Sequence, residues 1–224
     1  MKSRLTLFLD KTAAIFIDLQ EEHRRDRRFL AEGFDQVIVN ARALLDVARA
    51  NGIPVFHYAF VADPASTLPF HPVLANGKSV FSDKDDPLTA ICPEVAPAGD
   101  ERLIVKARAS AFGDGLGREL KTDGIEWLIV AGVWTEACVD ATVKDAQALG
   151  FRVALVKDAC ASGTVAMHQT AVLNLANRLY GGAVMDTQSA CRLMAGETVE
   201  AWQVAGAVPF RYTLKNVREL YEGL

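Results

Sequence analysis

The chain has 224 residues, of which 50% are hydrophobic, and its formal net charge at pH 7 is -4. This mild acidity, with Lys and Arg scattered along the chain, excludes the strong positive field of a nucleic-acid or anionic-membrane binder. No apolar run is long enough to span a membrane, and Asp10 and Lys11 interrupt the N-terminal run Leu5–Leu9 before it reaches signal-peptide length. We therefore expect a soluble, cytoplasmic protein without nucleic-acid or membrane partners.

Short apolar runs alternate with amphipathic stretches in the first part of the chain. The pattern predicts a strand over Ala13–Ile17, a helix over Phe34–Ala50 that ends at an Asn-Gly pair, and a second strand over Pro54–Phe60. Residues 63–100 are rich in turns and prolines, which is typical of a surface loop or lid.

The same alternation continues to the end of the chain. Strands are predicted over Leu103–Val105, Trp127–Val130, Phe151–Val156 and Ala183–Met185, and helices over residues 116–121, 165–179, 189–194 and 214–222. A further helix is predicted to carry Cys138 in its first turn and to end at Leu149. Repeated β-α-β order with continuously apolar strands predicts an α/β fold, with a single doubly wound, mainly parallel, Rossmann-like sheet covered by helices on both faces. We expect one domain over residues 1–224, with a core of about 13–195 and a C-terminal extension over 196–224.

Three chemically distinct side chains follow predicted strands. Asp18 ends the first strand, Lys106 ends the third, and Cys138 follows the fourth. Each has a structural alternative: Asp18 as a loop cap, Lys106 as a surface charge and Cys138 as a small buried hydrophobe. Because functional residues of such sheets gather at the carboxyl ends of the strands, the occurrence of all three there favours a shared site.

Cys138 lies where an apolar strand breaks at Gly132 and a helix is expected to begin. The Thr135 hydroxyl is predicted to cap this helix, which would place Cys138 at its third residue. Free backbone N–H groups and the positive end of the helix dipole at that position are expected to lower the thiol pKa. The remaining cysteines, Cys92, Cys160 and Cys191, lack such a setting, and their spacing favours neither disulfides nor a zinc site.

A carboxylate, an ammonium and a thiol at one sheet edge suit amide hydrolysis. Asp18 would take the thiol proton, Cys138 would attack the carbonyl carbon, and protonated Asp18 would return the proton to the departing amine. Lys106 would hold Asp18 ionised in a partly buried pocket. Water activated by Asp18 would then release the acyl group.

These residues resemble the isochorismatase-like cysteine hydrolases, a family that includes nicotinamidases, N-carbamoylsarcosine amidases, ureidoacrylate and biuret hydrolases, and isochorismatase. The resemblance covers about residues 13–191 and is carried by Asp18-Leu19-Gln20, by Lys106 followed by Ser110-Ala111-Phe112, and above all by residues 132–139. It implies an Asp18, Lys106 and Cys138 triad, and a non-proline cis peptide between Val133 and Trp134. It also implies an oxyanion hole from the backbone N–H groups of Trp134 and Cys138, and a homo-oligomer, either a dimer or a tetramer.

The chain departs from the nicotinamidases at the end of the second strand, where their metal-binding Asp-x-His motif is replaced by Ala59-Phe60-Val61. His57, His71 and Asp63 lie nearby in the sequence, but we expect a core role for His57 and a loop role for His71. We therefore expect no metal, no cofactor and no nicotinamidase activity.

The leading hypothesis is a hydrolase that cleaves the C–N bond of a small amide, carbamoyl or ureido compound through an acyl thioester at Cys138. Alternatives are an isochorismatase-type vinyl-ether hydrolase and a non-catalytic member of the family that binds a metabolite. A dinucleotide binder is disfavoured because no G-x-G-x-x-G follows the first strand. The substrate is expected to be compact or planar, and the candidate pocket residues are Phe16, Gln20, Tyr58, Phe60, Phe112 and Trp134.

Overall fold

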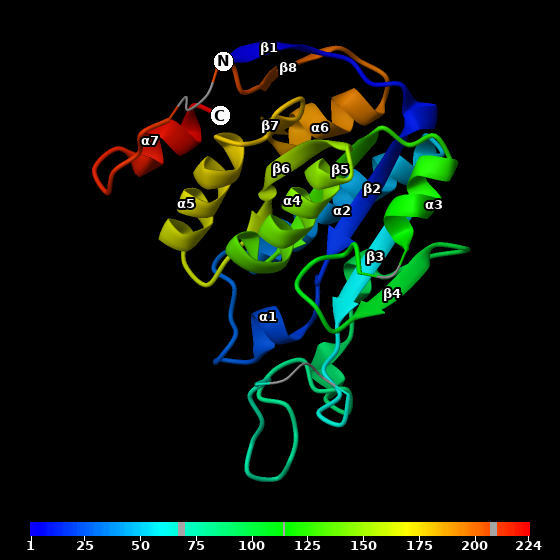
Figure 1. The fold of residues 1–224 in the computed structure, drawn as a ribbon, viewed down its shortest axis with the longest axis vertical. Coiled ribbons are helices and arrows are strands. Elements are labelled where there is room, and N and C mark those ends of the chain that lie inside the picture. Colours follow the sequence, from blue (N-terminus) through cyan, green and yellow to red (C-terminus); the bar gives the residue numbers. More distant parts are fainter. Residues whose placement is uncertain (67–69, 114, 207–209) are drawn as a thin grey trace.

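An eight-stranded sheet with the strand order β1-β8-β7-β6-β5-β2-β3-β4 forms the centre of the computed structural model (Figure 1). The structure describes residues 1–66, 70–113, 115–206 and 210–224, so residues 67–69 of the predicted loop lie outside the described part. Strands β2 to β7 pair in parallel, whereas β8 is antiparallel to both β7 and β1. The predicted α/β fold with a mainly parallel sheet is confirmed. The strands are β1 (Lys2–Leu5), β2 (Thr12–Ile17), β3 (Val55–Phe60), β4 (Arg102–Lys106), β5 (Trp127–Val133), β6 (Arg152–Ala161), β7 (Ala183–Met185) and β8 (Val199–Trp202).

Helices cover both faces of the sheet (Figure 1). One face packs on α2 and α6, and the other packs on α3, α4 and α5. Alternate residues of β2 point to opposite faces of the sheet. Ala14 and Phe16 pack in the core on the α2 and α6 side, whereas Ala13, Ile15 and Ile17 pack in the core on the α3, α4 and α5 side. Within the described ranges, no helix has the length and apolar character needed to cross a membrane. The helices are α1 (Glu22–Arg25), α2 (Phe34–Ala50), α3 (Leu116–Thr122), α4 (Asp140–Ala148), α5 (Val165–Ala176), α6 (Thr187–Met194) and α7 (Val217–Glu222).

Three parts of the fold differ from the sequence-based expectation. The sheet gains β1 and β8, which both lie outside the predicted core of residues 13–195. These four-residue strands were not predicted because neither contains a continuous apolar run. Strand β6 extends to Ala161, past the polar pair Lys157 and Asp158. The predicted helix that follows Thr135 and ends at Leu149 is divided into a π-helical turn over Thr135–Val139 and α4.

Gly132 allows β5 to approach β2 very closely. Its φ is +135°, and a Cβ at this position would lie 2.1 Å from the carbonyl oxygen of Ile17. Only glycine has both the backbone freedom and the space for this contact. Since Ile17 directly precedes Asp18, the contact sets the spacing between Asp18 and the turn that carries Cys138.

We predict that Gly132→Ala lowers the free energy of unfolding by about 3 kcal/mol or more, because the added methyl group overlaps the β2 backbone. Gly124→Ala is a matched control, since Gly124 also has a positive φ of +74° but no atom within 4 Å of the position that a Cβ would take. Its expected loss is about 1–2 kcal/mol, from backbone conformation alone. Urea unfolding of the two variants measures the difference, and equal losses would contradict the prediction.

Candidate active site

Asp18 and Cys138 lie where the strand order of the sheet reverses. From β2 the chain proceeds outward to β3 and β4, and it then returns to β5 on the other side of β2. The carboxyl ends of β2 and β5 therefore flank the switch point at which such sheets form their crevices. Lys106 is the last residue of β4 and reaches the same place across the end of β3.

A buried ion pair joins the first two residues of the predicted triad. Lys106 Nζ lies 2.7 Å from Asp18 Oδ2, and only 5% of Lys106 and 2% of Asp18 are exposed. The ammonium also donates to the Arg108 carbonyl oxygen at 3.2 Å and lies 5.1 Å from the centroid of the Phe60 ring. Asp18 has a left-handed backbone with φ 53°, a conformation that aspartate tolerates better than most residues.

The second carboxylate oxygen of Asp18 is placed differently. Oδ1 is buried and has no nitrogen or oxygen donor among the described residues. Burial raises the pKa of Asp18, and the charge of Lys106 opposes this effect only in part. The ionised carboxylate is therefore a stronger base than an ordinary aspartate, with one oxygen available to accept a proton.

The Cys138 thiol is close enough to Asp18 and Lys106 for both charges to affect its pKa. Burial raises the pKa of Cys138 to about 12, the negative charge of Asp18 adds to the increase, and Lys106 opposes it. The expectation of a lowered pKa is therefore wrong, because desolvation of the thiolate outweighs the favourable backbone field. The thiol is therefore protonated at neutral pH.

The turn that carries Cys138 also differs from the predicted helix start. The peptide bond between Val133 and Trp134 is cis, and Thr135–Val139 forms one π-helical turn. The N–H groups of Ala137 and Val139 both donate to the Trp134 carbonyl oxygen, at 3.0 and 3.2 Å. Thr135 does not cap the turn, because its hydroxyl donates to the Ala161 carbonyl oxygen at 2.8 Å instead.

A buried hydrogen-bond chain supports this turn from behind. The single Thr135 hydroxyl hydrogen is used on Ala161, so His168 Nδ1 donates to Thr135 Oγ1 at 2.8 Å. His168 Nε2 then accepts from the Tyr221 hydroxyl at 2.9 Å. Burial lowers the pKa of His168 to about 4, so the ring is neutral at neutral pH, as this pattern requires. Tyr221 belongs to α7, so the C-terminal extension contributes to the support of the turn.

A cavity of about 500 Å³ opens at the switch point. Of the residues predicted from the sequence, Asp18, Cys138, Phe60 and Trp134 line it. Lys106 is absent from the lining because its ammonium is turned towards Asp18 and the Arg108 carbonyl group.

The other four predicted pocket residues do not line this cavity. Phe16 is buried in the core and stacks on His57, and the Gln20 side chain binds the backbone of Phe60 and Thr89. Tyr58 is buried beside a smaller neighbouring cavity, and Phe112 stacks on Phe151. Closeness to a strand end in the sequence does not determine the face towards which a side chain points.

Most of the remaining cavity wall comes from two segments that the sequence did not single out. Residues in and after α1 supply Glu22, His23, Arg28 and Phe29, and the long loop between β3 and β4 supplies Phe81 and Ser82. Ala109 and Ala137 complete the lining. Two features of the sequence could have indicated that these segments line the cavity. Glu22 and His23 follow Asp18 closely, and the long loop was expected to be a surface loop or lid.

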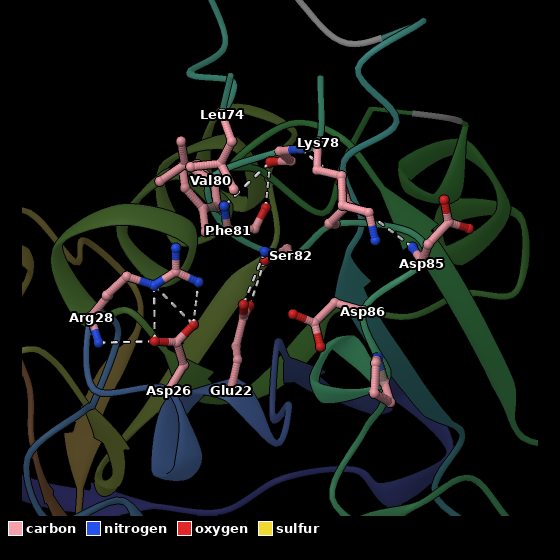
Figure 2. A pocket seen from close by; sticks show the side chains of 13 residues that line it. Glu22, Asp26, Arg28, Leu74, Lys78, Val80, Phe81, Ser82, Asp85 and Asp86 are labelled. Carbon is pink, nitrogen blue, oxygen red and sulfur yellow. Dashed lines mark hydrogen bonds and ion pairs between the residues drawn. The ribbon is translucent and has the colours of Figure 1, made fainter. Parts of the chain in front are cut away.

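Glu22 and Ser82 separate this cavity from a second one of about 280 Å³, which they also line (Figure 2). Both carboxylate oxygens of Glu22 accept hydrogen bonds from Ser82, one from its N–H and one from its hydroxyl. Arg28 lines both cavities as well, and its guanidinium is bound to Asp26 (Figure 2).

His23 and Trp134 are joined side by side in the cavity wall. Trp134 Nε1 lies 3.2 Å from His23 Nδ1, and an indole N–H can only donate. Nδ1 is therefore the acceptor, and the neutral ring carries its proton on Nε2. In this tautomer Nδ1 donates no hydrogen bond to the Phe29 carbonyl oxygen, which lies 3.3 Å away. Burial lowers the pKa of His23, which favours this neutral form.

The side chains considered as metal ligands have other partners. His57 Nε2 lies 2.9 Å from Glu101, His71 Nε2 lies 2.6 Å from Ser79 Oγ, and Asp63 pairs with Lys84. None of these three candidates lines the cavity that contains Cys138. In the described part of the chain, one group has suitable spacing for a metal, namely Glu21, Cys92 and Glu94, but Arg24 donates hydrogen bonds to both of its glutamates.

Comparison with known proteins agrees with this architecture. Residues 12–189 match the family profile of the isochorismatase domain. The chain belongs to the isochorismatase family. A cysteine hydrolase from Pseudomonas syringae pv. phaseolicola 1448A shares the fold, with a TM-score of 0.75, 19% identity, and coverage of 85% of this chain and 95% of that chain.

Two curated relatives of this isochorismatase-family protein are amidohydrolases. An N-carbamoylsarcosine amidase from an Arthrobacter species is 32% identical over 64% of this chain and 56% of its own length. A maleamate amidohydrolase from Pseudomonas putida is 28% identical over 83% of this chain and 89% of its own length. The family thus includes enzymes that hydrolyse C–N bonds.

We predict that the neutral His168 makes the protein less stable in acid. The folded-state pKa of about 4 lies below the ordinary value of 6.5, so the unfolded chain binds more protons between these values and stability falls as the pH decreases through this window. From pH 7 to pH 5 this effect amounts to about 1–2 kcal/mol. His168→Gln should reduce the stability loss over this interval by that amount, as measured by urea unfolding at both pH values. An unchanged loss would contradict the assignment.

Proposed function

We propose that this protein is a hydrolase that cleaves the C–N bond of a small amide, carbamoyl or ureido compound, with Cys138 as nucleophile and Asp18 as base. The observation that carries the proposal is the arrangement of the Asp18 carboxylate at a cavity it shares with Cys138. One oxygen of this carboxylate is bound to Lys106, and the other has no nitrogen or oxygen donor among the described residues. The amidohydrolases among the relatives support the same reaction class.

In the proposed first step, Asp18 Oδ1 accepts the Cys138 thiol proton as the sulfur attacks the carbonyl carbon. The C–S bond forms, and the carbonyl π electrons move to oxygen. Asp18 then delivers the proton to the nitrogen, the C–N bond breaks, and the amine or ammonia departs to leave an acyl thioester. Water then attacks the thioester carbonyl carbon and gives a proton to Asp18 as the new C–O bond forms. The C–S bond breaks, the acid departs, and Asp18 returns the proton to the sulfur to restore the thiol.

Lys106 has an electrostatic role in this proposal. Its ammonium keeps Asp18 ionised despite burial, and it offsets part of the negative charge that forms on sulfur. The thiol pKa of about 12 leaves Cys138 protonated before the substrate binds. The proposed mechanism therefore uses proton transfer from Cys138 to Asp18 during the attack, and it needs no preformed thiolate. Such general base catalysis contributes roughly 10²–10⁴-fold to the rate.

We assign stabilisation of the oxyanion to the backbone N–H groups of Trp134 and Cys138. The N–H groups of Ala137 and Val139 in the same turn already donate to the Trp134 carbonyl oxygen. One donor of this kind is worth about 10²–10³-fold in the rate.

We predict that Cys138→Ala abolishes hydrolysis and that Asp18→Asn, which keeps the shape but not the basicity, lowers kcat by about 10²–10⁴-fold. Ammonia release is measured across primary amides, carbamoyl amines and ureido acids, and intact-mass spectrometry detects the acyl adduct. Cys191→Ala is the matched control, since Cys191 is also partly buried but lies outside the cavity, and it should retain activity.

Two outcomes would contradict the proposal. Substantial turnover by Cys138→Ala would indicate chemistry without a thiol nucleophile, as in vinyl-ether hydrolysis. A folded wild-type protein that releases no ammonia and forms no adduct would indicate a vinyl-ether hydrolase or a binding protein.

A further inference from the structure

The cavity beside Cys138 has a continuous aromatic wall. Phe81 links two other rings, with its centroid 5.6 Å from that of Phe29 and 5.7 Å from that of Phe60. Trp134 lines the cavity as well, held by its hydrogen bond to His23. A volume of about 500 Å³ is ample for a compact ligand of one ring or a short chain.

The charged groups around this wall are largely paired with one another. Asp18 is neutralised by Lys106, and Arg28 is bound to Asp26 through contacts of 3.0, 3.2 and 2.6 Å. His23 contributes no positive charge, because its Nδ1 accepts the Trp134 proton and burial lowers its pKa. Among the described residues that line the cavity, no cation remains without a carboxylate partner.

Glu22 adds a carboxyl group to the same wall; burial raises its pKa, and the hydrogen bonds from Ser82 oppose this increase by stabilising the negative form. Only 4% of the residue is exposed, and its two oxygens are bound by the N–H and hydroxyl groups of Ser82 rather than by a cation. A ligand carboxylate would thus meet Glu22 and find Arg28 already engaged, whereas an apolar group would pack against the rings without such a penalty.

We propose that the acyl part of the substrate is uncharged and apolar, either an aromatic ring or a short alkyl or alkenyl chain. This assignment rests on the proposed amide hydrolysis for the nature of the ligand. The proposed preference differs from that of a relative such as the maleamate amidohydrolase, because maleamate is an amide that bears a carboxylate. Glu22 is the residue that rejects the charge, and Phe81 is central to the apolar contact.

The test compares maleamate with (Z)-but-2-enamide, in which a methyl group replaces the carboxylate, and with benzamide. Binding to full-length Cys138→Ala is measured by calorimetry, so this comparison needs no turnover. We expect the two neutral amides to bind at least tenfold more tightly than maleamate, and the wild type to show a preference of the same direction in kcat/KM. Equal or tighter binding of maleamate, or no binding of either neutral amide, would overturn the inference.

Two variants in the Cys138→Ala background locate the cause. Glu22→Gln, which is nearly isosteric, should tighten maleamate binding at least fivefold and change but-2-enamide binding less than twofold. Phe81→Ala should weaken benzamide binding at least fivefold. If Glu22→Gln leaves the maleamate affinity unchanged, the electrostatic basis of the inference is wrong.

The proposal on catalysis and the inference on selectivity fail in different ways. Preferred binding of neutral amides without ammonia release from any amide would refute the hydrolase and leave the selectivity intact. Efficient hydrolysis of maleamate in preference to its neutral analogue would refute the selectivity and leave the hydrolase intact.

Discussion

The buried ion pair between Asp18 and Lys106 is the interaction on which the site depends. Removing two charges from water is expensive, and attraction between them compensates only when the geometry is close, as it is at 2.7 Å. The pair joins the ends of two strands that are not neighbours, since β3 lies between β2 and β4. The parallel register of these strands therefore holds a carboxyl group and an ammonium group together at the cavity that contains Cys138. Loss of either partner would leave the other buried without compensation.

Burial and the charge of Asp18 explain why the thiol of Cys138, the proposed nucleophile, is protonated. An increase of the Cys138 pKa from 9.0 to about 12 corresponds to about 4 kcal/mol, whereas a helix terminus contributes about 0.3–1 kcal/mol. Burial therefore outweighs the local backbone field. The same burial raises the pKa of Asp18, so the acid and the base shift in the same direction and proton transfer between them remains feasible. These shifts are consistent with the proposed transfer of a proton from Cys138 to Asp18 and do not favour a preformed thiolate.

Helix and strand positions were predictable where one periodicity dominates. The helix α2 has the predicted bounds Phe34–Ala50, because seven buried apolar side chains recur on one face and an Asn-Gly pair ends it. Strands β1 and β8 were missed, since they pair with each other across about 200 residues and neither contains a continuous apolar run. The π-helical turn was also missed, because Thr135 finds an acceptor on the end of β6, which a local capping rule cannot anticipate.

The sequence by itself determined the α/β fold, because continuous apolar runs are a local feature of buried parallel strands. It also determined that an acid, an amine and a thiol follow strands, and parallel pairing brings the carboxyl ends of those strands to one edge of the sheet. Only the tertiary structure decided the direction of the Cys138 pKa and the lining of the cavity. Both depend on burial and on segments far apart in the chain, such as Glu22 and Ser82, which are 60 residues apart yet share two hydrogen bonds. The tertiary structure also showed that the side chains of Phe16 and Tyr58 point into the core and not into the cavity. The sequence could not show this, since the two faces of a buried strand are distinguished only by what packs against them.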